Sequence, residues 1–170
     1  RILAINPECK VHCIEDFFSE STMDKILNKD FDYVIDAIDS MKSKCILISE
    51  CRKRKIKIIT TGGAGGKFDP SHIRIGDLSK CFNDKLLGTV RNNLKRFYSF
   101  PKHTNVKFHV PCVFSPEFRT EPEQDTTASA LNCQNGYGSL THTTGIFGFM
   151  AAGYVINDLL KKESKAELRK

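Results

Sequence analysis

The sequence predicts an α/β fold, because two buried strands are joined by a helix and followed by a strand of a different kind. The runs 33–37 and 56–59 are short and apolar, as strands covered on both faces are. Between them, apolar residues recur at helical spacing, at Met41, Cys45, Ile48 and Cys51. This order is typical of a right-handed βαβ unit. The alternating run 73–77 indicates a half-exposed strand.

The remaining elements are predicted from caps and periodicity. Ser40 is the expected N-cap of the helix that runs to about residue 55. The polar face of this helix is expected to carry its basic residues, Lys42, Lys44, Arg52, Lys53 and Arg54. Asn83 or Asp84 is expected to cap a second helix, which ends near residue 98. Its inward face is predicted to consist of Leu87, Val90, Leu94 and Phe97.

Shorter or less regular segments complete the prediction. A helix is expected at 21–28, a final helix at 140–161, and strands at 11–14 and 107–115. The polar stretch 116–135 is expected to form a long loop, and loops of that length are often functional.

Composition indicates one globular domain. The chain has 170 residues, of which 40% are hydrophobic, and its longest apolar run is shorter than the roughly 20 residues needed to span a bilayer. Seven cysteines with no CxxC pair argue against a disulfide framework or a zinc knuckle. We therefore expect an intracellular, reducing location, either cytoplasmic or organellar. The formal net charge of +6 permits a polyanionic partner such as RNA, and equally a solvated basic surface.

The first residues predict that a further N-terminal part precedes Arg1. They resemble the last turn of a helix stopped by Pro7. A targeting segment would belong to that part, and no phosphate-cradling glycine loop precedes the two buried strands.

An acid and a glycine run follow the two buried strands, where open α/β sheets bind ligands. Asp39 comes just after the first strand, and a carboxylate there can hold Mg²⁺ against nucleotide phosphates, or simply cap the helix. Asp36, inside the strand, is expected to make structural hydrogen bonds. Gly62 and Gly63 are candidates for phosphate contact, with a plain glycine turn as the alternative.

Two other groups of residues are candidates. Cys133 lies in a polar, glycine-containing loop before the final helix, so it is either a reactive thiol or ordinary packing. Arg91 and Lys95 are four residues apart on one helix face and could contact RNA phosphates, although a solvated face explains them equally. The five histidines show no metal-ligand spacing.

Several motifs together resemble the ThiF/MoeB/HesA superfamily of ubiquitin-activating-enzyme-like proteins, and most closely its branch of tRNA threonylcarbamoyladenosine dehydratases. They are YVIDAIDS (33–40), CRKRKI (51–56), TTGGAGG (60–66), Asp69-Pro70, Asp77-Leu78 and the C-terminal segments around Val113–Ser115, Cys133, Gly136–Gly138 and Phe147–Phe149. The resemblance implies a partial, Rossmann-like α/β fold, with a mixed sheet, flanking helices and the N-terminal nucleotide-binding half missing. Residues 1–66 would then end the nucleotide-binding sheet, and 67–170 would form the substrate and dimer side.

The resemblance also implies a function. Members of this superfamily bind ATP and Mg²⁺ and activate a carboxylate, here that of threonylcarbamoyladenosine in tRNA, which then closes to its cyclic form. It implies that Asp39 serves metal and nucleotide, that Cys133 matches a cysteine linked to sulfur-transfer partners, and that the enzyme is a homodimer. The alternatives are adenylation of a ubiquitin-like or sulfur-carrier protein, a non-catalytic scaffold or RNA-binding fragment, and a nicotinamide-dependent oxidoreductase. The chain alone is expected to be inactive.

Overall fold

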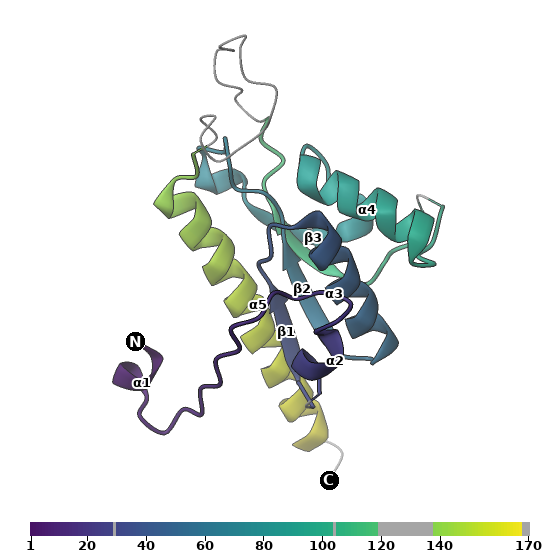
Figure 1. Cartoon of the computed structure of the whole chain (residues 1–170). Coiled ribbons are helices and arrows are strands. Elements are labelled where there is room, and N and C mark those ends of the chain that lie inside the picture. The colour runs from purple at the N-terminus through teal and green to yellow at the C-terminus, as the bar shows by residue number, and fades with distance from the viewer. Residues whose placement is uncertain (29, 104, 119–137, 168–170) are drawn as a thin grey trace.

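A four-stranded mixed sheet with helices on both faces forms the molecule (Figure 1). The computed structural model describes residues 1–28, 30–103, 105–118 and 138–167. The sheet order is β1 (Tyr33–Asp36), β2 (Lys57–Thr61), β4 (Pro111–Phe114) and β3 (Arg74–Asp77). The first three strands are parallel, and β3 runs antiparallel to β4. The predicted α/β fold with a mixed sheet is confirmed.

Helices α3 (Met41–Lys53) and α4 (Lys85–Phe97) cover one face of the sheet, and α5 (Thr141–Glu167) covers the other (Figure 1). The short elements are α1 (Ile2–Ile5), α2 (Met23–Ile26) and the 3₁₀ turns η1 (Pro70–His72) and η2 (Leu78–Lys80). The segment before β1 runs across the outside of the sheet from α1 to α2 (Figure 1).

The alternation of strand side chains builds two separate cores. Ile58 and Cys112 face α3 and α4, whereas the next residues, Ile59 and Val113, face α5. The larger core fills the α3/α4 side with buried residues such as Ile48, Leu87, Val90, Leu94 and Phe108. Burying each such large side chain contributes about 1.5–3 kcal/mol. The core on the α5 side is smaller, and α5 contributes the buried residues Phe147 and Ala151 to it.

Most predicted elements are confirmed, including the caps. The side chain of Ser40 accepts from the Ser43 amide at 3.5 Å, and that of Asp84 accepts from the Leu87 amide at 2.9 Å. The strand predicted at 11–14 is wrong, because those residues are exposed and pair with no strand. The inward position predicted for Phe97 is also wrong: it ends α4 and is 64% exposed.

Two predictions from composition can be compared with the described residues. The cysteines that the structure describes, Cys9, Cys13, Cys45, Cys51, Cys81 and Cys112, are all free thiols, so no disulfide framework joins them. In the same part of the chain, no helix has both the length and the hydropathy needed to cross a bilayer.

Candidate functional site

The carboxyl ends of three parallel strands bring the predicted site residues to one edge of the sheet. Asp36 pairs with Thr60, and Thr60 pairs with Cys112, so the residues after them leave the sheet side by side. Asp39 therefore follows β1 on the same edge where Gly62 follows β2. This is the edge at which open α/β sheets bind ligands.

Asp39 is exposed and free at this edge. It has no hydrogen bond or ion pair within the part of the chain that the structure describes. The alternative that it caps α3 is not what the structure shows, because the neighbouring Ser40 provides the cap. The carboxylate is thus available to a ligand, and it lies one residue before the positive end of a 13-residue helix.

A buried ionic network lies directly behind Asp39. The Lys44 ammonium donates to Asp36 Oδ2 at 2.8 Å and to Thr60 Oγ1 at 3.1 Å, and Thr60 Oγ1 donates to Asp36 Oδ2 at 2.6 Å. All three residues are fully buried. Asp36 Oδ1 also accepts from the Ile38 amide at 3.0 Å, which fixes the turn that leads to Asp39. The structural role predicted for Asp36 is confirmed.

The prediction that Lys44 lies on the polar face of its helix is wrong. It lies on the apolar stripe beside Cys45 and Ile48, and its side chain is 0% exposed. A signal was present in the sequence, since Lys44 falls three residues after Met41 and four before Ile48. A lysine in such a stripe needs a buried acid as partner, and Asp36 is the acid in the adjacent strand.

The glycine run is held against α4 by its capping residue. Asp84 Oδ2 accepts from the Gly63 amide at 2.9 Å, while Asp84 Oδ1 accepts from Leu87. Burial raises the pKa of Asp84, an effect that these amide donors and Lys67 oppose. The Gly62 amide donates to the Val113 carbonyl at 2.8 Å. Both amides are engaged within the protein, so phosphate contact by Gly62 and Gly63 stays a prediction.

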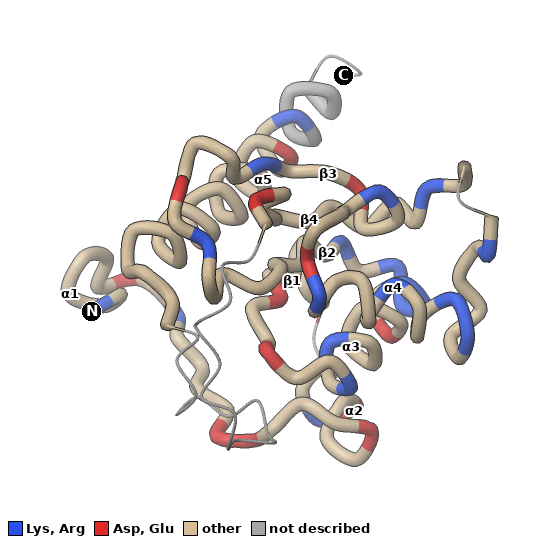
Figure 2. The backbone as a smooth tube through the Cα atoms, turned by 90° about the horizontal axis from the view of Figure 1, so that it is seen from above, with Lys and Arg blue, Asp and Glu red and all other residues tan. Residues whose placement is uncertain are grey.

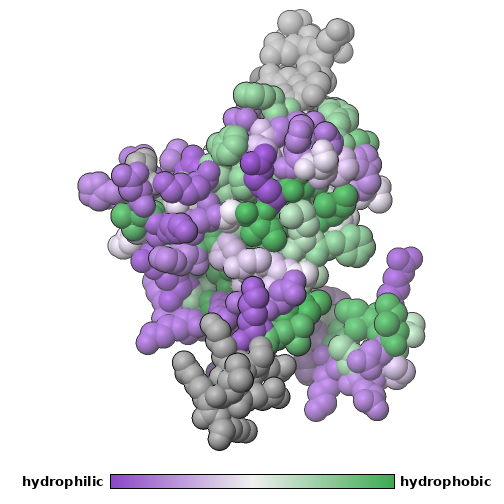
Figure 3. Space-filling model, turned by 180° about the vertical axis from the view of Figure 1, so that it is seen from behind, coloured by the Kyte–Doolittle hydropathy of each residue, from purple (hydrophilic) through white to green (hydrophobic). Residues whose placement is uncertain are grey.

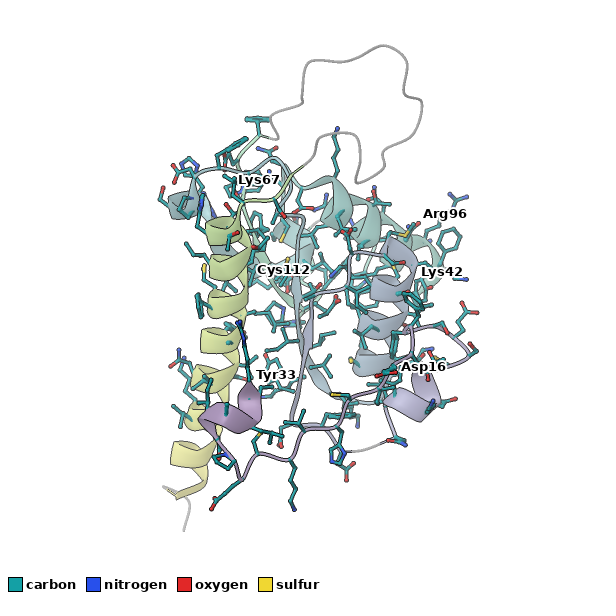
Figure 4. All side chains as sticks on the ribbon, turned by 60° about the vertical axis from the view of Figure 1, so that its left-hand side comes forward. Asp16, Tyr33, Lys42, Lys67, Arg96 and Cys112 are labelled. Atoms are coloured by element: carbon teal, nitrogen blue, oxygen red, sulfur yellow. The ribbon has the colours of Figure 1, made fainter. Side chains whose placement is uncertain are left out.

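Lys67, which the sequence analysis did not identify, joins the chain segments at the same end of the sheet (Figure 4). Its ammonium donates to the main-chain carbonyls of Asn83 at 3.0 Å, Ser115 at 3.3 Å, and Glu117. The Glu117 carboxylate in turn accepts from the amides of Phe68 and Asp69. These partners are 16 to 50 residues away in sequence, so no local sequence pattern predicts the contacts of Lys67.

The other predicted site residues have different outcomes. Arg91 is half-buried and donates through Nη1 to the Cys81 carbonyl, which ties α4 to η2. Lys95 is half-buried, and Cys133 lies outside the described residues. Among residues that the structure describes, no cluster of three or more His, Cys, Asp or Glu could hold a metal ion.

A cavity of about 450 Å³ lies away from Asp39, between β3 and α5. Its lining includes Ile75, Met150, Tyr154 and Lys161. Asp39, which lies on the exposed edge of the sheet, is not among the residues that line this cavity.

Comparison with known proteins places this geometry in context. The chain matches the ThiF family over residues 1–170. It is 46% identical over 167 residues to the tRNA threonylcarbamoyladenosine dehydratase of Haemophilus influenzae, covering 96% of this chain and 64% of that enzyme. It is 37% identical over 175 residues to the Escherichia coli enzyme of that name, covering 97% of this chain and 65% of that enzyme.

The fold also matches a solved structure, that of the E. coli tRNA N6-threonylcarbamoyladenosine dehydratase TcdA in complex with ATP. The TM-score is 0.85 at 36% identity, over 96% of this chain and 62% of the other. The chain thus spans slightly less than two thirds of each of these relatives.

Replacing Lys44 with Met is expected to destabilise the full-length protein by about 3–5 kcal/mol, because it leaves the buried Asp36 carboxylate without its partner. The control is Lys42→Met on the same helix, where an exposed lysine changes stability by less than about 0.5 kcal/mol. Adding Asp36→Asn to Lys44→Met should recover part of the loss. Denaturant unfolding measures all three variants, and equal stability of the two single variants would contradict the role given to the pair.

Gly62→Ala and Gly63→Ala form a matched pair. A Cβ on Gly62 would lie 2.1 Å from Asp84 Oδ2 and 2.9 Å from Leu87 Cδ1, whereas one on Gly63 would lie 4.0 Å from Asp84 Oδ1. We expect Gly62→Ala to cost about 1–3 kcal/mol and Gly63→Ala to be neutral or slightly stabilising. The melting temperature measures both, and equal losses would show that close approach of Asp84 is not the reason for the glycine.

Proposed function

We propose, from the premise that this chain belongs to the ThiF family, that it is part of an ATP-dependent enzyme that dehydrates threonylcarbamoyladenosine in tRNA to its cyclic form. The observation that carries the proposal is 46% identity, across 96% of this chain, to an enzyme named for that reaction. The fold supports it independently, through its match to a dehydratase bound to ATP. The same names favour a tRNA substrate over a carrier protein.

The chemistry requires that a carboxylate become an electrophile. A carboxylate oxygen of the modified nucleoside attacks the α-phosphorus of ATP, and pyrophosphate leaves. A nucleophile of the same modification then attacks the acyl carbon, and AMP leaves with the carboxylate oxygen. Counted from the carboxylic acid, the acid proton, the proton lost on ring closure and the oxygen that leaves with AMP together make up the missing water. Negative charge develops on phosphate oxygens in the first step, so the site must supply positive charge there.

Asp39 is the residue of this chain that we assign to the nucleotide. Its carboxylate is exposed, free of ion pairs among the described residues, and placed at the ligand-binding edge of the sheet. One carboxylate combined with phosphate oxygens suits Mg²⁺, which seldom uses an all-protein cage. When bound, Mg²⁺ would neutralise charge on the phosphates.

We also propose that the enzyme is a homodimer. Figure 3 shows apolar side chains gathered along α5 and on α1. On α5, Phe149, Ile156 and Leu160 share one helix face and are 79%, 57% and 56% exposed. Light scattering of the full-length protein tests this, and a monomer would refute it. The proposed sulfur-transfer partner of Cys133 stays a prediction.

The central test gives full-length protein ATP, Mg²⁺ and tRNA that carries the linear modification. Mass spectrometry of the nucleosides should show loss of water. Asp39→Asn should lower kcat by about a hundredfold or more, because it removes the carboxylate charge that we assign to the metal and nucleotide. The substitution keeps the size of an exposed side chain, so the fold should not change. Asp30→Asn, at an exposed acid before β1, is the control and should keep activity.

The two parts of this proposal fail separately. Wild-type enzyme that turns over ATP but leaves the tRNA mass unchanged would end the dehydratase assignment. Asp39→Asn with wild-type kcat would leave the reaction in place and remove Asp39 from it.

A further inference from the structure

The part of the sequence that forms α4 and the segment after it is strongly basic. Residues 85–116 contain six Lys and Arg residues and no Asp or Glu. The whole chain has 26 basic and 20 acidic residues, so removing these six leaves 20 of each. Residues 85–116, which comprise α4 and the segment after it, thus carry a formal charge of +6, as large as that of the whole chain. Figure 2 shows the basic residues gathered along α4 and near α3.

The C-terminal end of α4 packs over the start of α3, and the basic side chains there point outward. Asn93 Nδ2 lies 2.9 Å from Met41 Sδ, which brings the two helices together. Figure 4 shows Lys42 and Arg96 on the same outer side of the molecule. Both are exposed, and neither forms an ion pair with another described residue. We call the surface formed by Met41, Lys42, Asn93, Arg96 and Phe97 the α3/α4 corner.

An aromatic ring lies among these charges. Phe97 is 64% exposed, although its spacing continues the buried stripe of α4. The Arg96 guanidinium lies over its ring, 5.0 Å from the centroid. A large exposed ring beside unpaired cations contributes little to the fold. It supplies the two elements that single-stranded nucleic acid uses, a flat stacking partner and positive charge for phosphates.

We propose that the α3/α4 corner is the surface that binds a single-stranded loop of RNA. A base stacks on Phe97, and the charges of Lys42 and Arg96 contact the neighbouring phosphates. Lys42 lies three residues after Asp39, so the bound loop adjoins the edge assigned to the nucleotide. The inference rests on the proposed function only for the identity of the RNA as the anticodon region of a tRNA.

The corner fits RNA better than the pair predicted from spacing. Arg91 already donates to the Cys81 carbonyl, and Lys95 is half-buried, so neither presents its full charge. An acidic protein would also be attracted to Lys42 and Arg96, but it would not require an exposed ring positioned for stacking. The ring therefore distinguishes the two partners, and it can be changed without altering the charge.

The experiment measures binding of full-length protein to a synthetic anticodon stem–loop hairpin without ATP, with a fully paired RNA duplex for comparison. Phe97→Ala should weaken hairpin binding by about fivefold to a hundredfold, because one stacked base is lost. Phe97→Tyr keeps the stacking surface and should bind as the wild type does. The duplex, which has no free base, should bind Phe97→Ala and wild type alike.

A second pair of variants tests the charges. Lys42→Gln with Arg96→Gln should reduce the slope of log affinity against log salt by about 0.7 for each lost phosphate contact. Lys161→Gln removes an exposed lysine from α5, across the sheet, and should leave the slope unchanged apart from the small effect of net charge. Melting temperature and ATP affinity, measured on every variant, should stay at wild-type values.

Three results would overturn the inference: wild-type protein that fails to bind the hairpin, a Phe97→Ala variant that binds it normally, or equal losses for hairpin and duplex. An acidic carrier protein that loses affinity while the hairpin does not would make the corner a protein-docking surface instead. Hairpin binding that follows the variants, without any dehydration of tRNA, would leave the surface in place and refute the proposed function.

Discussion

The buried pair of Asp36 and Lys44 is the interaction on which the candidate site depends. It joins β1, α3 and, through Thr60, β2, and all three side chains are withdrawn from water. Such pairs rarely add net stability, because desolvating two charges costs as much as their attraction returns. Their effect here is geometric: with one oxygen bound to Lys44 and Thr60, Asp36 presents the other to the Ile38 amide and so orients the turn that carries Asp39.

At this end of the sheet, two further charged side chains form internal hydrogen bonds that fix the conformation of a loop. Asp84 caps α4 and also accepts a hydrogen bond from the Gly63 amide. Its carboxylate can come this close because Gly62 has no side chain. The Lys67 ammonium donates hydrogen bonds to carbonyls of the loops before α4 and after β4. The loops at this edge are therefore set by internal charges, and Asp39 is left without an internal partner among the described residues.

Local patterns in the sequence were enough for most of the elements and for the caps of α3 and α4, although not for residues 11–14, which form no strand. Ser40 was predicted as a cap, and Asp84 as one of two candidates with Asn83, because a cap and the helix it starts are neighbours in the chain. The position of Asp39 followed from the strand before it. Lys67 could not be found in this way, since its partners come from distant segments. Phe97 shows the limit of periodicity, because the stripe of Val90 and Leu94 continues past the point where the core ends.

The exposed and buried charges therefore have different functions that composition alone does not separate. Lys44 and Lys67 are buried cations that position neighbouring loops, so a count of basic residues overstates the positive charge at the surface. Lys42 lies on α3, as Lys44 does, and Arg96 lies on α4, yet both are exposed, and the Arg96 guanidinium lies over the exposed Phe97 ring. A net charge of +6 is modest for the whole chain, but residues 85–116 contain six basic and no acidic residues, so the surface around α4 is locally positive. The RNA-binding surface that we propose, the corner between α3 and α4, adjoins the edge that carries Asp39, because Lys42 lies three residues after it.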